Sequence, residues 1–187
     1  MLVVAQGEEK TIRLDKRAEE ERIKIQEQGS AIVFIEGPRK LTLDILLMGP
    51  DASLEVIGRF RGTGKERQEI ILRIIQQAPR TSARIDFRSA LSDASFSLFD
   101  GLIRVEESAA EARGFLAYKA LLLSPSARAK PIPRLEVLTK DVASLGHAAS
   151  VGKIDQDQLF YLQSRGLPRE QAEHLSIEGF LAIPKTA

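Results

Sequence analysis

The residues best suited to chemistry in this chain are few. His147 lies in the small-residue segment LGHAASVG, and an imidazole can ligate a metal or transfer a proton near neutral pH. The 187 residues include no cysteine, which excludes disulfides, thiolate zinc sites, cysteine nucleophiles and all-cysteine iron–sulfur ligation. We interpret His147 as a structural or interface histidine, with metal ligation as the alternative, and His174 as a surface residue.

Other motifs with catalytic potential are incomplete. The segment Gly58–Gly64, GRFRGTG, lacks the Lys-Ser/Thr ending of a phosphate loop and no helical pattern follows it, so we predict a hairpin or loop. Glu106–Glu107 and the pair Asp155 and Asp157 could supply two carboxylates to a carbohydrate enzyme. The first pair borders a turn, however, and the second suits helix capping. With no Gly-x-Ser-x-Gly or His-Glu-x-x-His motif, the sequence predicts no enzyme.

These residues must be positioned by a largely β structure. Segments rich in β-branched and aromatic residues, with partial alternation, predict strands. They are Thr11–Leu14, Arg22–Gln26, Ala31–Glu36, Leu41–Leu47, Ser53–Ile57, Gln68–Gln76, Ala83–Arg88, Ser95–Val105 and Gly114–Leu123. Gly and Pro separate many of them, and no helical period appears before residue 155.

A loose repeat runs through the strand region. A turn, a small residue and a strand recur, with alanines at 94, 112, 127 and 143. Small residues at a fixed corner would let successive coils stack closely, which predicts a short-period β-solenoid. A β-sandwich fits the number of strands and turns nearly as well. The pattern alone leaves both folds open.

The period changes at Asp155. Asp155 or Asp157 can cap a helix whose apolar stripe is Leu159, Phe160 and Leu162. The helix is expected to end with Arg165 in its last turn and Gly166 in a left-handed conformation just beyond it.

A second helix is expected to follow directly. Pro168 suits its first turn, an apolar side of Ala172, Leu175, Gly179 and Phe180 runs along it, and Pro184 ends it. We therefore predict a short helical hairpin docked on a β body. Residues 1–153 would form the β-helix core, with the first 28 or so as its cap, and residues 154–187 the hairpin.

Composition limits the partners. The chain has 27 basic and 26 acidic residues, so it lacks the field that nucleic-acid binding needs. It is 43% hydrophobic and 28% charged, and no apolar run approaches the length of a membrane span. The first five residues do not resemble a signal peptide. We expect a cytoplasmic protein with no nucleic-acid or membrane partner.

Several motifs in the second half resemble one family. They are Phe99-Asp100-Gly101, LLLS at 121–124, PRLEV at 133–137, GHAASVG at 146–152, LFYLQSRG at 159–166 and EGF at 178–180. Over about residues 99–183 the chain resembles the SufB/SufD family, scaffold subunits of iron–sulfur cluster assembly that work with an ABC-type ATPase. The resemblance favours a right-handed parallel β-helix over a sandwich, and it suggests a short SufD-like member.

The resemblance also bears on His147. The family often has Cys-x-His-Gly-Ala-Thr-Val-Gly in this region, which lies at the SufB–SufD interface; here Leu145 stands where Cys would be. The family's cluster-forming cysteine would align near Ala127, and its acidic partner near Ala148. The resemblance therefore implies that no cofactor is bound by this chain alone. A cluster is conceivable only at an interface with a partner, with His147 as the candidate metal ligand.

The C-terminal helices carry the implied partner site. Phe160, Tyr161, Arg165 and Gly166 match the family's FYL-x-SRG, in a region that members use to dock their ATPase, and Phe180 belongs to the closing EGF. The resemblance implies a non-catalytic scaffold or adaptor. It would bind a SufC-like ABC ATPase and pair through its β-helix end with a SufB/SufD-like subunit or a second copy as a dimer. The alternatives are a self-associating β-helix module without an iron–sulfur role and a metal-independent binder of small molecules.

Overall fold

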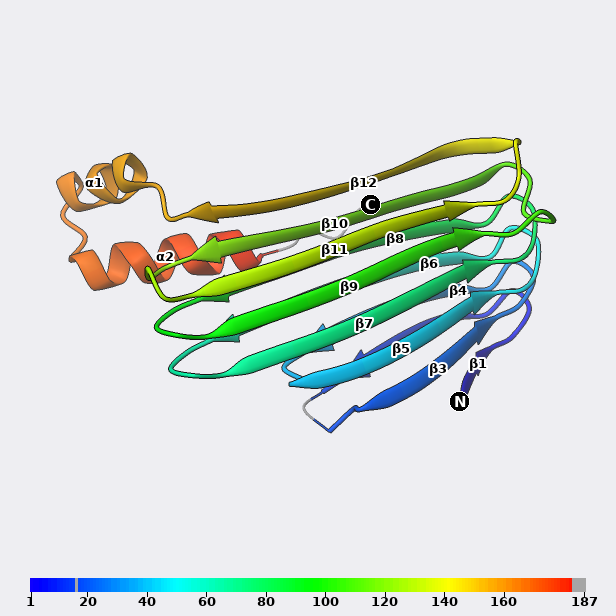
Figure 1. Cartoon of the computed structure of the whole chain (residues 1–187), viewed down its shortest axis with the longest axis horizontal. Coiled ribbons are helices and arrows are strands. Elements are labelled where there is room, and N and C mark those ends of the chain that lie inside the picture. The colour runs from blue at the N-terminus through cyan, green and yellow to red at the C-terminus, as the bar shows by residue number, and fades with distance from the viewer. Residues whose placement is uncertain (16, 183–187) are drawn as a thin grey trace.

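The chain winds into two stacked parallel sheets (Figure 1), seen here in a computed structural model that describes residues 1–15 and 17–182. One sheet, called sheet A, has the order β1 (Leu2–Val4), β3 (Glu20–Ile25), β5 (Lys40–Leu47), β7 (Arg67–Gln76), β9 (Phe96–Val105) and β11 (Arg128–Val137). The other, sheet B, has the order β2 (Glu9–Leu14), β4 (Ser30–Glu36), β6 (Ser53–Gly62), β8 (Ser82–Leu91), β10 (Ala112–Leu122) and β12 (Val142–Lys153).

Successive strands alternate between the sheets, and each pairs in parallel with the strand two places along the chain. This is a β-solenoid, as predicted. The sandwich alternative is wrong, because sandwich strands pair in antiparallel fashion whereas every pairing among the described residues is parallel. Every predicted strand overlaps an observed one.

The corners that lead into sheet B repeat a backbone device. At four of these corners a non-glycine residue with positive φ donates its N–H to a carbonyl of the next coil: Gln28 to Pro50, Asp51 to Pro79, Arg80 to Ala110 and Glu111 to Asp141, at 2.8 to 3.2 Å. The residue that follows is small and shielded from solvent, as Ala52, Thr81 and Ala112 show. Stacked corners thus satisfy backbone groups that would otherwise be left without partners.

The predicted alanine repeat is only partly right. Ala112 and Ala127 are buried, but Ala94 and Ala143 are exposed. Ala112 begins a strand of sheet B whereas Ala127 precedes a strand of sheet A, so the two occupy opposite ends of the body. The four alanines therefore form no single stacked column.

The core lies between the two sheets and contains three aromatic rings in succession. The ring centroids of Phe87 and Phe99 are 5.1 Å apart, as are those of Phe99 and Tyr118. Gly58 faces this group: a Cβ there would lie 1.9 Å from the Phe87 ring. The predicted loop at Gly58–Gly64 is therefore wrong for its first part, because Gly58 is a strand residue that leaves room for an aromatic ring.

A buried polar chain crosses the same core. The Tyr118 hydroxyl donates to Ser97 Oγ at 3.1 Å, and Ser97 in turn lies 3.2 Å from Ser89 Oγ. Ser97 also donates to Gln68, whose amide nitrogen donates to the Pro38 carbonyl at 3.0 Å. Burial raises the pKa of the Tyr118 phenol above its ordinary value.

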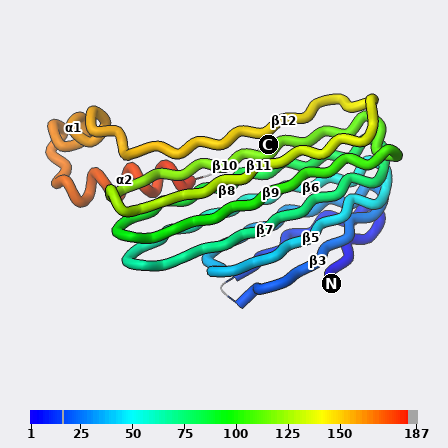
Figure 2. Tube along the Cα trace, in the orientation of Figure 1, coloured from blue at the N-terminus to red at the C-terminus, as the bar shows by residue number. Residues whose placement is uncertain are grey.

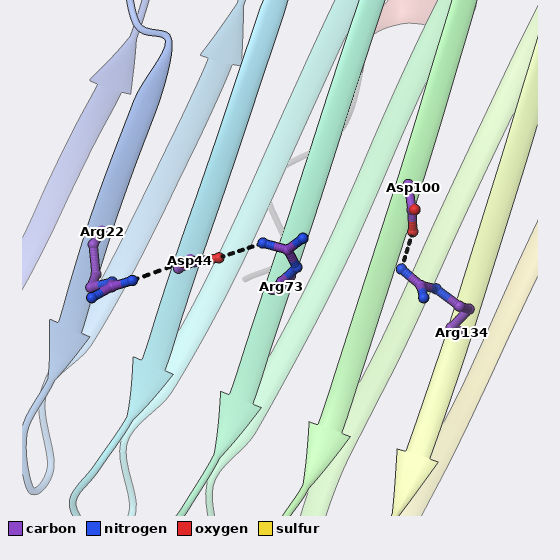
Figure 3. Close-up of polar contacts among 5 residues, drawn as sticks. All are labelled: Arg22, Asp44, Arg73, Asp100 and Arg134. Atoms are coloured by element: carbon purple, nitrogen blue, oxygen red, sulfur yellow. Dashed lines mark hydrogen bonds and ion pairs between the residues drawn. The ribbon is translucent and has the colours of Figure 1, made fainter.

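The outer face of sheet A carries charges that alternate from strand to strand (Figure 3). Asp44 lies between Arg22, at 3.2 Å, and Arg73, at 3.6 Å, and Arg134 pairs with Asp100 further along the sheet. Pairs this exposed add little stability each. Their alternation keeps like charges from lying opposite one another on neighbouring strands.

Two helices follow β12: α1 (Gln156–Ser164) and α2 (Arg169–Leu181). The Asp155 side chain accepts hydrogen bonds from the N–H groups of Asp157 and Gln158, as an N-cap does. Gly166 has φ +92°, the left-handed conformation predicted for it, and Pro168 is the N-cap of α2. No helix in 1–15 and 17–182 is long and apolar enough to span a membrane.

The apolar sides of the helices differ from the prediction. In α1 only Leu159 is buried, whereas Phe160 projects outward with 72% of its surface exposed. In α2 the buried residues are Ala172, Ile177 and Leu181 rather than Leu175, which is 53% exposed. The predicted helix end at Pro184 lies outside the described residues.

Candidate partner interface

The solenoid ends in two unlike edge strands. In the described residues, β11 is the last strand of sheet A and β12 the last of sheet B. Strand β11 contains Pro131 and Pro133, and proline lacks the N–H that a pairing strand would need. Strand β12 has no proline and consists mainly of Gly, Ala, Ser and Val. Its free edge is therefore the better template for another strand.

His147 lies on this edge strand. Its Cα partner on β10 is Leu116, and Leu145 and Val151 are opposite Gly114 and Ala120. Those β10 residues face the core, so the same side of β12 continues the core surface beyond the last coil. There His147 is exposed and Val151 is 45% exposed.

The surroundings of His147 do not fit a metal centre within this chain. The described residues contain no group of three His, Cys, Asp or Glu side chains that could hold a metal ion. Ala148 is an exposed neighbour on β12, and Ala127 is buried at the corner before β11. Neither can ligate, so the chain offers one imidazole to iron or to a cluster.

Helix α1 stands apart from the β body. It lies beyond the strand ends at the left of Figure 1, and its main packing partner is α2. Next to the exposed Phe160, Tyr161 is 55% exposed and its ring stacks under the Arg165 guanidinium at 5.2 Å. Aromatic rings and arginine are the residues that most often anchor interfaces.

Helix α2, in contrast, is fixed to sheet B. Ile177 and Leu181 pack on Ala90 of β8, with Leu121 and Phe180 at the margin of this apolar cluster. Phe180, predicted with the partner-binding residues, is thus partly covered by the sheet. The predicted hairpin is thus docked on the β body through α2, whereas α1 packs mainly on α2.

A residue that the sequence did not point to secures this contact. Arg88, on the outer face of β8, donates to the carbonyl oxygens of Phe180 at 2.8 Å and Ala182 at 3.1 Å. Asp86 holds the guanidinium at 3.0 Å. A cation at a helix C-terminus satisfies its free carbonyls and is favoured by the helix dipole. The alternation of inward and outward residues along β8 could have predicted that Arg88 points outward. Nothing in the sequence indicated that it would bind the end of α2.

The structure thus defines a class: a parallel β-solenoid with an open terminal strand and a projecting helix, surfaces suited to binding other proteins. A family model described as "SUF system FeS cluster assembly, SufBD core domain" matches residues 9–180. The chain belongs to the SufBD family. The match extends well upstream of residue 99, where the motifs first become recognisable.

Curated relatives agree. The chain is 36% identical over 132 residues to the iron–sulfur cluster assembly protein SufD of Bacillus subtilis, an alignment that covers 71% of this chain and 29% of that protein. It is 29% identical over 148 residues to an iron–sulfur cluster assembly SufBD family protein of Mycobacterium bovis, covering 75% of this chain and 37% of the relative. The chain therefore spans well under half the length of these relatives.

Proposed function

We propose that this protein is a non-catalytic scaffold or adaptor in iron–sulfur cluster assembly that docks a SufC-like ABC ATPase through α1. The observation that carries the proposal is the exposed group Phe160, Tyr161 and Arg165 on a helix held clear of the solenoid. Leaving two aromatic rings in water is unfavourable unless a partner covers them. The family membership supports the iron–sulfur setting.

The arrangement suits the transmission of movement. Helix α2 is tied to β8 by an apolar cluster and by Arg88, so a force applied at α1 would reach the sheet through a firm contact. ATP-driven closure of the ATPase dimer would then change the position of the scaffold. In this hypothesis the chain performs no bond-making step of its own.

The test is a capture assay with the purified chain and the SufC-like ATPase from the same source, with and without ATP. The proposal expects capture that depends on nucleotide. Absence of capture, together with equal behaviour of wild-type and Arg165→Ala proteins, would contradict it and favour the self-associating structural module.

We further propose pairing through the free edge of β12, with a second copy or a longer SufB/SufD-like subunit. Small side chains along this strand would let another strand approach, whereas the prolines of β11 oppose the same contact on sheet A. The pairing would cover the exposed side of Val151 and bring His147 to the interface.

At such an interface His147 would offer its imidazole to the iron or cluster being assembled, while the partner supplies the remaining ligands. The test compares iron retained by wild-type and His147→Ala chains, each reconstituted with the partner. Lower retention in the variant is expected. Equal retention would leave His147 a structural residue.

A further inference from the structure

A cleft lies where the solenoid widens, away from both surfaces described above. Strand β4 ends at Glu36, which pairs with Arg59, but β6 continues through Phe60 and Arg61 to Gly62. The coil of β6 and β7 therefore overhangs the coil of β4 and β5. Figure 2 shows the connection into β5 set back from the connection into β7.

The cleft under this overhang has a volume of about 560 Å³, within the range of roughly 300–1,000 Å³ that is typical of small-molecule sites. Its charged lining is mostly basic: Arg39, Lys40, Arg59 and Arg61, with Glu19 and Glu66. The chain as a whole has nearly equal numbers of basic and acidic residues, so this excess of cations is local.

Ion pairs account for part of the basic set. Arg39 lies 3.3 Å from Glu66, and Arg61 lies 3.3 Å from Glu178 of α2. The Thr63 N–H donates to Glu66 and lowers the pKa of that carboxyl, so Glu66 is ionised at neutral pH. These two arginines therefore line the cleft with their charges already paired.

Unlike Arg39 and Arg61, the Arg59 and Lys40 side chains have no partner among the described residues. In the described part of the chain neither side chain forms a hydrogen bond or an ion pair, and Arg59 is only partly exposed. Its Nε is shielded from solvent and meets no acceptor. A guanidinium N–H withdrawn from water without an acceptor is destabilising, so an anion that drew the Arg59 side chain toward the cleft would relieve this cost.

We propose that this cleft binds a small ligand bearing a phosphoryl group. The Arg59 guanidinium would bind two phosphoryl oxygens side by side, Lys40 would supply a point charge, and the ion-paired Arg39 and Arg61 would border the site. Nothing in the proposed scaffold function requires this site, so the two can be tested separately.

The test follows amide NMR signals of the purified chain as inorganic pyrophosphate is added at constant ionic strength. Saturable shifts are expected at Gly37, Lys40 and Phe60. A parallel titration with ADP distinguishes the source, since equal affinity indicates a bare phosphoryl ligand and tighter binding a nucleotide. The doubly substituted Arg59→Gln, Lys40→Gln protein should bind at least about tenfold more weakly.

The matched control is Arg128→Gln with Lys130→Gln, which removes the same charges from exposed positions on β11. It should bind like wild type. The proposal is overturned by no saturable shift up to about 10 mM, by wild-type affinity in the cleft variant, or by an equal loss in the control. Should circular dichroism show that the double variant is unfolded, Lys40→Gln alone replaces it under the same criteria.

Discussion

The Arg88 guanidinium and the Phe180 carbonyl oxygen are 2.8 Å apart, and this contact joins the outer face of β8 to the end of α2. The Arg88 side chain is only 15% exposed, so its charged hydrogen bonds are shielded from water and salt. Through it, a helix with only three buried side chains keeps a defined position on the sheet.

Arg88→Gln should loosen α2. Loss of a charged hydrogen bond in this setting costs about 2 kcal/mol, equivalent to roughly thirtyfold faster amide exchange in α2. Hydrogen exchange with mass spectrometry measures this directly. Arg84→Gln, an exposed position on the same strand, serves as the control and should leave exchange in α2 unchanged. Equal exchange in both variants would show that the apolar cluster alone holds the helix.

Gly58→Ala should destabilise the solenoid. The new Cβ would lie 1.9 Å from the Phe87 ring, which is fully buried and packs against Phe99 at a tilt of 38°, so the ring or the backbone must shift. Such overpacking costs about 1–3 kcal/mol. Chemical denaturation measures the free energy of unfolding. Gly152→Ala, with open space around the added Cβ, should change it by less than about 0.5 kcal/mol.

Tyr118 should make stability depend on pH in alkaline solution. Burial raises its folded-state pKa above the ordinary value of 10.0, so above that pH the unfolded chain releases the phenolic proton first. Stability contributed by the neutral phenol is thus complete below about pH 10 and falls by up to about 1.4 kcal/mol for each further pH unit.

Tyr118→Phe removes this dependence and also the hydrogen bond to Ser97, worth about 1 kcal/mol. Wild type should therefore be the more stable protein at pH 8, and its advantage should shrink above pH 10. Urea unfolding of both proteins at pH 8 and above pH 10 measures the difference in their free energies of unfolding. A gap that stays constant with pH would mean that the phenol titrates normally.

Val151→Lys should weaken pairing through β12. A lysine on an edge strand opposes association, and Val151 is 45% exposed at the end of the core. With a second copy as the partner, light scattering should show a dimer for wild type and mainly monomer for the variant. Val3→Lys, at the opposite end of the solenoid and 43% exposed, should remain dimeric. A variant as dimeric as wild type would place the contact elsewhere.

The sequence predicted the middle of the solenoid well because its inward positions carry Ile, Leu, Val and Phe in regular alternation. It predicted the last strand poorly from pattern alone, since β12 contains Gly146, Gly152 and several alanines, which have low strand propensity. That strand exists because it pairs along β10, a contact between residues far apart in the chain. The alanine repeat predicted a single stacked column that does not exist, because spacing along the chain does not say which end of a coil a residue occupies.

The candidate binding surfaces were also only partly predictable from the sequence. Phe160, Tyr161 and Arg165 could be chosen from the sequence, because a motif marked them. The exposure of these side chains could not be predicted, because a helix with an apolar stripe of Leu159, Phe160 and Leu162 could equally have packed on the sheet. The role of Arg88 depends on carbonyl oxygens at the end of α2, and the cleft beside Arg59 depends on β4 ending before β6 does. No spacing within one segment reveals either arrangement.

The measurement that tests the central claim most directly is the affinity of the SufC-like ATPase for this chain and for two variants of α1. The doubly substituted Tyr161→Ala, Arg165→Ala protein should lose at least about tenfold in affinity. Gln163→Ala, exposed on the same helix, should bind like wild type. All three should unfold at the same temperature, because the side chains lie on the surface. Equal affinity for all three proteins would contradict docking through α1.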